Sequence, residues 1–461
     1  MVRLGSVLLV LLTTSISQAA DPSGWKAGVA VRVITPKGPM WLAGYASRNR
    51  PSEGTEQDLH VKALAIEDPR GQRVVLLTSD LIGISQSLAD AVCEEVGKKT
   101  GLGRESILLT CSHTHCGPVV KNNLEDMYEM PAEESAKIAP YTRDLQAKMV
   151  AVIGEAIGKV KPAHLAVGKG IARFAVNRRN NKEAEVPGIQ ARGGSLSGPV
   201  DHDVPVLRVS DSEGKAMAVV FGYACHNTTL SFQRWCGDYA GYAQEYIEKQ
   251  HPGCAAMFWT GCGADSNPLP RRTVELCRRY GKELSDSVEA VLEGTMTPIT
   301  GQLSARYAEV DLPYDRLPGG EQIAAEMLSK NHALRKRAEK LRADLDKKGK
   351  IASSYTRYPV QVWRLGDQVL WVALGGEVVV DYALALKKML ARDKQTVWVA
   401  GYANDVMAYI ASARVLKEGG YEGESAMIYY GLPTKWSSVV ESLILTKADE
   451  LARRCSLGLP E

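Results

Sequence analysis

Short apolar runs alternate along this chain with longer segments in which apolar residues recur every three or four positions. The apolar run Arg73–Ser79 predicts a buried strand, residues 87–100 predict an amphipathic helix, and residues 106–110 predict the next strand, so that together they predict a βαβ unit. Further buried strands are predicted at residues 217–223, 254–259, 369–373 and 396–400, and further helices at residues 240–250, 271–292 and 381–392. This alternation predicts an α/β fold with a largely parallel core sheet flanked by helices.

Two segments interrupt the alternation. Residues 175–202 are polar and rich in glycine, which predicts a long surface loop that is either functional or a plain insertion. Residues 321–350 are highly charged with helical spacing, which predicts a solvated helical excursion. Neither segment has the composition of a domain linker, so we expect a single domain over residues 21–461.

The first twenty residues have the pattern of a secretory signal peptide. A basic start at Arg3 precedes an apolar run from Leu4 to Leu12, and small residues follow. The run is too short to span a bilayer, so cleavage near Ala19 or Ala20 is predicted. We therefore expect a secreted or periplasmic protein that is soluble after cleavage.

Composition narrows the classes of partner and site. The 56 Lys and Arg residues nearly balance the 53 Asp and Glu residues, so the charge gives no reason to expect nucleic acid. The nine cysteines contain no C-x-x-C spacing, so a structural zinc knuckle is not expected. Their number is odd, which leaves at least one unpaired within the chain, and the sequence does not assign partners.

Polar residues gather where the predicted strands end. His113 and His115 follow the strand at residues 106–110, His226 follows that at 217–223, and Glu377 follows that at 369–373. Ligands of parallel sheets bind beyond the carboxyl ends of the strands, so neighbouring strands would place these groups on one rim. This convergence indicates an active site.

His-x-His in an extended backbone turns both imidazoles to one face, which suits metal binding but is a weak signal alone. The alternative is a pair of histidines that are hydrogen-bonded at a strand end. His226 and Glu377 favour the metal, because two histidines and a carboxylate leave an open position, the pattern of a catalytic zinc. Asp201-His202-Asp203 is a weaker candidate for a second metal, and no G-x-S-x-G nucleophile frame is present.

At this point the residues resemble a known family. The segment Ser112-His113-Thr114-His115-Cys116-Gly117-Pro118 resembles the HTHSGP motif of the neutral/alkaline, non-lysosomal ceramidases, with Cys116 in place of the serine. The resemblance begins at Ile34-Thr35-Pro36 and Leu42-Ala43-Gly44-Tyr45 and extends in the same order to about Tyr430. Many ceramidases carry a C-terminal immunoglobulin-like domain, which we expect to be absent here because the chain ends soon after the last motif.

The resemblance implies roles for individual residues. The zinc ligands of the family match His113, His226, Glu377 and Tyr409. The histidine that helps polarise the scissile carbonyl matches His115, a second site tyrosine in a Y-E motif matches Tyr421, and the arginine that contacts the substrate matches Arg178. Ser266 falls at the position of a family serine, although its neighbours in Gly263-Ala264-Asp265-Ser266-Asn267-Pro268 are permuted.

The implied function is a zinc-dependent hydrolase that cleaves an amide bond. Zn²⁺-activated water would attack an N-acylsphingosine or a related N-acyl lipid and release a fatty acid and an amine. Such a substrate implies transient contact with a membrane surface. Two alternatives stay open: a metal hydrolase of the same fold that acts on another ester or amide, and a secreted binding protein without turnover. Acyl-chain preference and oligomeric state are not accessible from the sequence.

Overall fold

The computed structural model describes residues 24–393 and 395–457. The predicted signal peptide at residues 1–20 lies outside them. Within the described ranges, no helix combines the length and the apolar composition that a membrane span requires.

Two stacked sheets form the centre of the molecule. The larger has the strand order β4-β3-β2-β1-β5-β7-β8-β9, with β11 added beside β5. Its strands are β1 Lys26–Val33, β2 His60–Glu67, β3 Arg73–Ser79, β4 Ile107–Cys111, β5 Lys161–Ile171, β7 Asp203–Asp211, β8 Ala216–Tyr223, β9 Ala255–Thr260 and β11 Thr297–Pro298. The smaller sheet has the order β12-β13-β14-β16 and consists of β12 Leu303–Pro313, β13 Ser354–Leu365, β14 Val369–Leu374 and β16 Thr396–Ala400.

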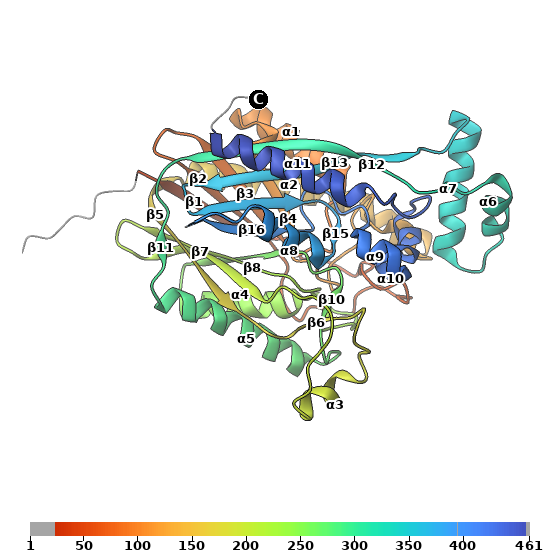
Figure 1. The fold of residues 1–461 in the computed structure, drawn as a ribbon, viewed down its shortest axis with the longest axis horizontal. Helices are drawn as coiled ribbons and strands as arrows, with labels where there is room; N and C mark the ends of the chain where they lie inside the picture. Colours follow the sequence, from red (N-terminus) through yellow and green to blue (C-terminus); the bar gives the residue numbers. More distant parts are fainter. Residues whose placement is uncertain (1–23, 394, 458–461) are drawn as a thin grey trace, which may run out of the picture.

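Helices cover the outer face of each sheet. Four helices pack on the larger sheet: α1 Gln86–Thr100, α2 Ala132–Gly158, α4 Asp238–Gln250 and α5 Val274–Glu293. The smaller sheet is covered by α8 Val380–Met389 and α11 Val440–Leu457. Figure 1 shows α4 and α5 along one side of the molecule and α11 along the other. The space between the sheets is filled by apolar side chains that include Trp259, Trp371 and Trp398, so the layers are helix, sheet, sheet, helix.

Three βαβ units are present in the described part of the chain: β3-α1-β4, β8-α4-β9 and β14-α8-β16. Each gives a parallel strand pair, as the alternating pattern predicts. The α/β class with a helix-flanked core sheet is thereby confirmed.

The sheets are mixed, however, and less parallel than expected. The strands β1, β2 and β3 pair antiparallel, as do β5, β7 and β8. The sequence does not reveal this direction, because both faces of the larger sheet are buried. A strand that is buried on both faces is a continuous apolar run whichever way its neighbour points.

Both interrupting segments contain structure. Residues 175–202 include β6 Ala175–Asn177 and the short helix α3 Val186–Ala191, and β6 pairs with β10 Ser266–Pro268. Residues 321–350 lie in α6 Gly320–Met327 and α7 His332–Lys348, which stand at one end of the molecule (Figure 1). The second segment is not merely solvated, because α7 buries Ala338 and Leu341.

Five short helical segments complete the helices of the described chain. They are α9 Ala413–Glu418, α10 Gly420–Gly423 and the 3-10 helices η2 Glu125–Met127 and η3 Ser425–Tyr430, and a further 3-10 turn, η1 Arg104–Ser106, precedes β4. A last pair of short parallel strands, β15 Glu377–Val378 and β17 Tyr409–Ile410, completes the rim.

Candidate metal centre and adjoining cavity

The carboxyl ends of strands from both sheets are tied together by hydrogen bonds. The Thr260 hydroxyl at the end of β9 donates to the carbonyl oxygen of Cys111 at the end of β4, at 2.9 Å. The backbone amide of Asn404, which follows β16, donates to the carbonyl oxygen of Leu109 at 2.8 Å. The loops that follow the parallel strands therefore share one rim, as the positions of the polar residues predict.

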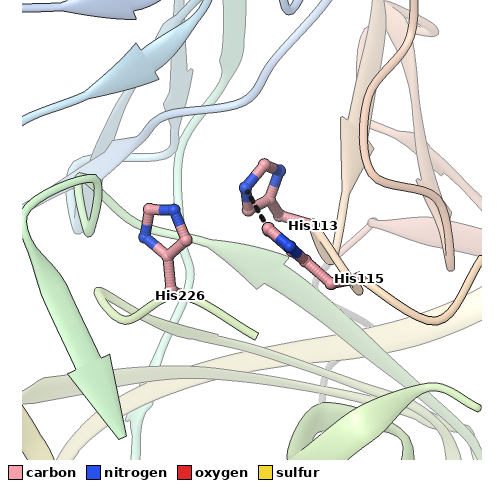
Figure 2. A group of neighbouring side chains, drawn as sticks. All are labelled: His113, His115 and His226. Atoms are coloured by element: carbon pink, nitrogen blue, oxygen red, sulfur yellow. Dashed lines mark hydrogen bonds between the residues drawn. The ribbon is translucent and has the colours of Figure 1, made fainter. Parts of the chain in front are cut away.

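Three histidines meet on this rim. His113 and His115 follow β4, and His226 follows β8. Figure 2 shows His226 facing the other two rings across a common space, and one ring nitrogen of each lies within 4.8 Å of the others. All three are buried, and His113 has a φ of 57°, a strained backbone conformation for a residue other than glycine. The cluster could hold a metal ion.

Hydrogen bonds to the backbone fix which nitrogen of each ring is free. Nδ1 of His113 lies 2.6 Å from the carbonyl oxygen of Ile82, and Nδ1 of His226 lies 2.9 Å from that of Gly263. A carbonyl oxygen can only accept a hydrogen bond, so both Nδ1 atoms carry a proton and donate it. In a neutral ring, Nε2 is then unprotonated and its lone pair is free to bind a metal ion. Burial, with the positive charge of Arg178, lowers the pKa of His226 to about 4, so this ring is neutral at pH 7.

Glu377 faces the two free nitrogens. Its Oε2 lies 3.2 Å from Nε2 of His113 and 3.1 Å from Nε2 of His226, and no hydrogen bond to this buried oxygen is present. The other carboxylate oxygen accepts a hydrogen bond from the Tyr430 hydroxyl. A buried carboxylate oxygen that faces two lone pairs is unfavourable unless a cation lies between them.

Tyr409 brings a fourth oxygen to the same place. β15 and β17 pair in parallel with Glu377 opposite Tyr409, which puts the two side chains beside each other. The Tyr409 hydroxyl lies 3.2 Å from Nε2 of His226 and accepts a hydrogen bond from Arg178 at 3.1 Å. Burial, with the charge of Glu377, holds the pKa of Tyr409 well above its usual range.

These donor atoms fit a zinc ion in both type and spacing. Two imidazole nitrogens, a carboxylate oxygen and a phenol oxygen form a set of borderline and hard ligands, which zinc accepts. Ligand atoms at the corners of a tetrahedron with bonds of about 2.0–2.1 Å lie about 3.3 Å apart. The separations of 3.2 Å between His113 and Glu377, 3.1 Å between His226 and Glu377, and 3.2 Å between His226 and Tyr409 are close to that edge length.

His115 lies beside this set. Its Nε2 is 3.2 Å from Nε2 of His113 (dashed in Figure 2), and its ring packs on Tyr45 with centroids 4.8 Å apart. Burial, with the neighbouring His113, holds the pKa of His115 well below its usual range. The ring borders an open cavity, which Tyr409 also lines, so the histidine cluster lies at the wall of that cavity.

The cavity has a volume of about 650 Å³ and is lined by most of the remaining predicted residues. Arg178, Tyr409 and Tyr421 line it together with His115. Arg178 follows β6, and its guanidinium also pairs with Glu422 at 2.7 Å. The polar segment at residues 175–202 therefore brings a residue to the site and is not a plain insertion.

Two sequence candidates are placed elsewhere. Ser266 is fully buried and does not line the cavity, while its carbonyl oxygen accepts a hydrogen bond from the amide of His226 at 2.9 Å. Asp201 and Asp203 do not form a vacant metal site, because Nζ of Lys387 lies 2.7 Å and 2.8 Å from their carboxylates. The nine cysteines are buried and none is in a disulfide.

Three residues that contact the site were not predicted from the sequence. Tyr430 bonds Glu377, Tyr402 packs its ring 4.4 Å from that of His113, and Arg48 donates to the carbonyl oxygen of His115 at 2.6 Å. Tyr402 was accessible in principle, because it follows β16 on the same rim. Tyr430 and Arg48 follow no strand end, so no signal in the sequence selects them.

A family profile and individual relatives place this chain in the same protein family. A family profile described as "Neutral/alkaline non-lysosomal ceramidase, N-terminal" matches residues 25–263, more than half of the chain. The chain is 25% identical to neutral ceramidase A of Dictyostelium discoideum over 257 residues, which are 52% of this chain and 34% of the relative. It is also 25% identical to a neutral ceramidase of Oryza sativa subsp. japonica over 247 residues, 52% of this chain and 30% of the relative. The matches thus span about a third of these curated relatives.

Solved structures share the fold over nearly the whole chain. The neutral ceramidase from Pseudomonas aeruginosa superposes with a TM-score of 0.71 and 18% identity, covering 95% of this chain and 75% of that one. A ceramidase complexed with C2 superposes with a TM-score of 0.73 and 18% identity, covering 95% and 76%. At this identity the likeness establishes the fold.

Proposed function

We propose a function for this chain from the premise that it belongs to the neutral/alkaline, non-lysosomal ceramidase family. The chain is a metal-dependent hydrolase of amide bonds. Its substrate is an N-acylsphingosine or a related N-acyl lipid, which it cleaves to a fatty acid and an amine. The names of its relatives support this substrate class.

One observation carries the metal dependence. Oε2 of Glu377 lies 3.2 Å from Nε2 of His113 and 3.1 Å from Nε2 of His226, and the Nδ1 atoms of both rings are engaged by carbonyl oxygens. We assign His113, His226, Glu377 and Tyr409 as the residues that hold zinc. When bound, zinc supplies a Lewis acid for attack by water on an acyl carbon.

The side chains on the cavity side of this set act on the substrate. His115, Tyr421 and Arg178 stabilise the negative charge that develops on the acyl oxygen. Arg178 is held in place by Glu422 and Tyr409, so it needs little reorganisation during the reaction. For Ser266 the geometry favours a positioning role, in which its carbonyl oxygen holds the backbone of His226.

The test is hydrolysis of N-octanoylsphingosine by the purified chain. Protein stripped by a chelator should be inactive, and one equivalent of zinc should restore activity. Full activity in the stripped protein would overturn the metal dependence. A zinc-loaded protein that leaves the substrate intact, but cleaves other amides or esters, would retain the hydrolase and reject the ceramide.

We also propose that the chain is exported and cleaved near Ala19 or Ala20, which the pattern of the first twenty residues supports. The intact mass of protein recovered from outside the cytoplasm measures the mature N-terminus. An N-terminus still at Met1 would contradict export by this route.

A further inference from the structure

Arg272 lies at the edge of the cavity, one aromatic ring away from His115. The ring of Tyr45 packs on His115 with centroids 4.8 Å apart, and Cζ of Arg272 lies 5.4 Å from the Tyr45 centroid. All three residues line the cavity. A group that extends from the scissile bond across Tyr45 would therefore reach the Arg272 guanidinium.

The backbone of Arg272 is held in an unusual conformation. Its φ is 97°, in the region that favours glycine, and its amide donates to the carbonyl oxygen of Thr229 at 2.7 Å. The next residue, Thr273, caps helix α5 by accepting a hydrogen bond from the amide of Leu276. A strained residue persists only where its surroundings fix it, and such residues concentrate at functional sites.

Arg272 differs from its neighbours in having no ion pair among the described residues. Arg178, Arg179 and Arg271, which line the same cavity, each pair with a glutamate. No carboxylate of the described residues lies within ion-pair distance of Arg272.

A second arginine on this side, Arg48, also has no ion pair among the described residues. Arg48 is buried, and its Cζ lies 5.3 Å from the centroid of Tyr45. Its guanidinium donates to the carbonyl oxygens of Ala43, Phe232 and His115 and to the amide oxygen of Gln233, all of which are neutral. Arg272 on the cavity wall and Arg48 behind Tyr45 therefore both add positive charge on this side of the cavity.

The cavity also has few aliphatic side chains. Leu269 has the only aliphatic side chain among the described residues that line it, and its other members are polar, charged, aromatic or glycine. Its charged and polar side chains offer hydrogen-bond and ion-pair partners to the polar part of a substrate.

We propose that the cavity binds an amide whose amine part carries a carboxylate, as in an N-acyl amino acid, with the Arg272 guanidinium as its partner. This substrate class refines the proposed function and rests on it. Water adds its oxygen to the acyl carbon, the carbon–nitrogen bond breaks, and the amine nitrogen takes a proton. The products are a fatty acid and an amino acid, and no further reactant is needed.

The experiment compares N-octanoylglycine with N-octanoylethanolamine, which replaces the carboxylate with a hydroxymethyl group. The zinc-loaded chain should have a kcat/KM roughly ten to a hundred times higher for N-octanoylglycine, as expected for a charge-assisted hydrogen bond. Isothermal titration calorimetry of the same two compounds should give a similar ratio of binding constants.

Variants of Arg272 test whether its charge causes the preference for N-octanoylglycine over N-octanoylethanolamine. R272M should remove most of the ratio, and R272K should keep a part of it. R272G should also remove it, although glycine adopts the φ of 97° without strain, so the loss would not reflect a distorted loop. The matched control is R143M, which removes an exposed arginine of α2 outside the cavity and should leave the ratio unchanged.

The rate of hydrolysis tests the proposed function, and the ratio of binding constants tests the carboxylate site. Equal kcat/KM and equal binding for the two compounds overturn the carboxylate site. A preference that survives in R272M and R272G also overturns it, because the carboxylate would then bind elsewhere, for example at the metal. Selective binding that depends on Arg272, without hydrolysis of either compound, supports the site and overturns the hydrolase.

Discussion

Gly44 lies so close to His115 that a Cβ atom on Gly44 would be 2.3 Å from Nδ1 of the histidine. Gly44 also has a φ of 102°, a backbone conformation that residues other than glycine rarely adopt. Its amide donates to the hydroxyl of Tyr128 at 2.6 Å, so the backbone cannot move away without losing that bond. The segment Leu42-Ala43-Gly44-Tyr45 therefore fixes the place of the His115 ring.

G44A should displace His115 and lower kcat/KM on any hydrolysed amide. A displacement of about 1 Å at a reacting group can cost about a hundredfold in rate. The matched control is G38A, because a Cβ atom on Gly38 would meet nothing within 4 Å. The measurement is kcat/KM of both variants after their folding has been checked by circular dichroism. Equal activities would contradict the role of Gly44.

H226A should abolish stoichiometric zinc binding. The wild-type chain should hold one zinc per molecule and should melt at a higher temperature with zinc than without it. Zinc at a hundred times its dissociation constant would stabilise the folded chain by about 2.7 kcal/mol. The control is H251A, which removes another histidine paired with a glutamate, Glu289, at 2.9 Å. Elemental analysis and thermal unfolding measure both effects, and a zinc content that H226A leaves intact would count against the ligand set.

Y430F should weaken zinc binding while the ligands themselves stay in place. The variant loses the hydroxyl that donates to Glu377, and partners of metal ligands typically contribute about 10- to 100-fold in affinity. Y429F is the control, since it removes a hydroxyl from the neighbouring position of η3. Competition with a zinc indicator gives the dissociation constants. Affinities that are the same in Y430F and the wild type would show that the bond does not support the site.

D405N should change how stability depends on pH. Burial raises the pKa of Asp405 from 3.8 to about 7, although the Tyr355 hydroxyl donates to it at 2.6 Å. Between these values the folded chain keeps a proton that the unfolded chain has lost. The free energy of unfolding therefore falls as the pH rises through this window, by on the order of 4 kcal/mol in total.

Asparagine does not titrate, so in D405N the free energy of unfolding should no longer fall between about pH 4 and pH 7 because of this position. The variant should therefore be more stable than the wild type at pH 8. Urea unfolding at pH 5 and pH 8 measures the difference. The exposed Asp144 provides the control D144N, which should follow the wild type. Parallel pH profiles for D405N and the wild type would refute the prediction.

The sequence predicted the local units of the fold and the candidate metal ligands. Each βαβ unit is visible because its strands are apolar runs and its helix is periodic, and both patterns are local. The histidines and Glu377 were also found, because each follows a buried strand directly. The ceramidase resemblance added Tyr409, Tyr421 and Arg178, whose positions no periodicity indicates.

Only the tertiary structure decided how these pieces meet. It pairs most strands antiparallel, brings Arg178 from a polar loop to Tyr409, and brings Tyr430 from η3 to Glu377. It also leaves Ser266 outside the cavity and, among the described residues, leaves Arg272 without an ion pair. These relationships depend on contacts between residues far apart in the chain. Each such contact is set by the packing of whole layers, so the pattern of apolar and polar residues around any one position does not contain it.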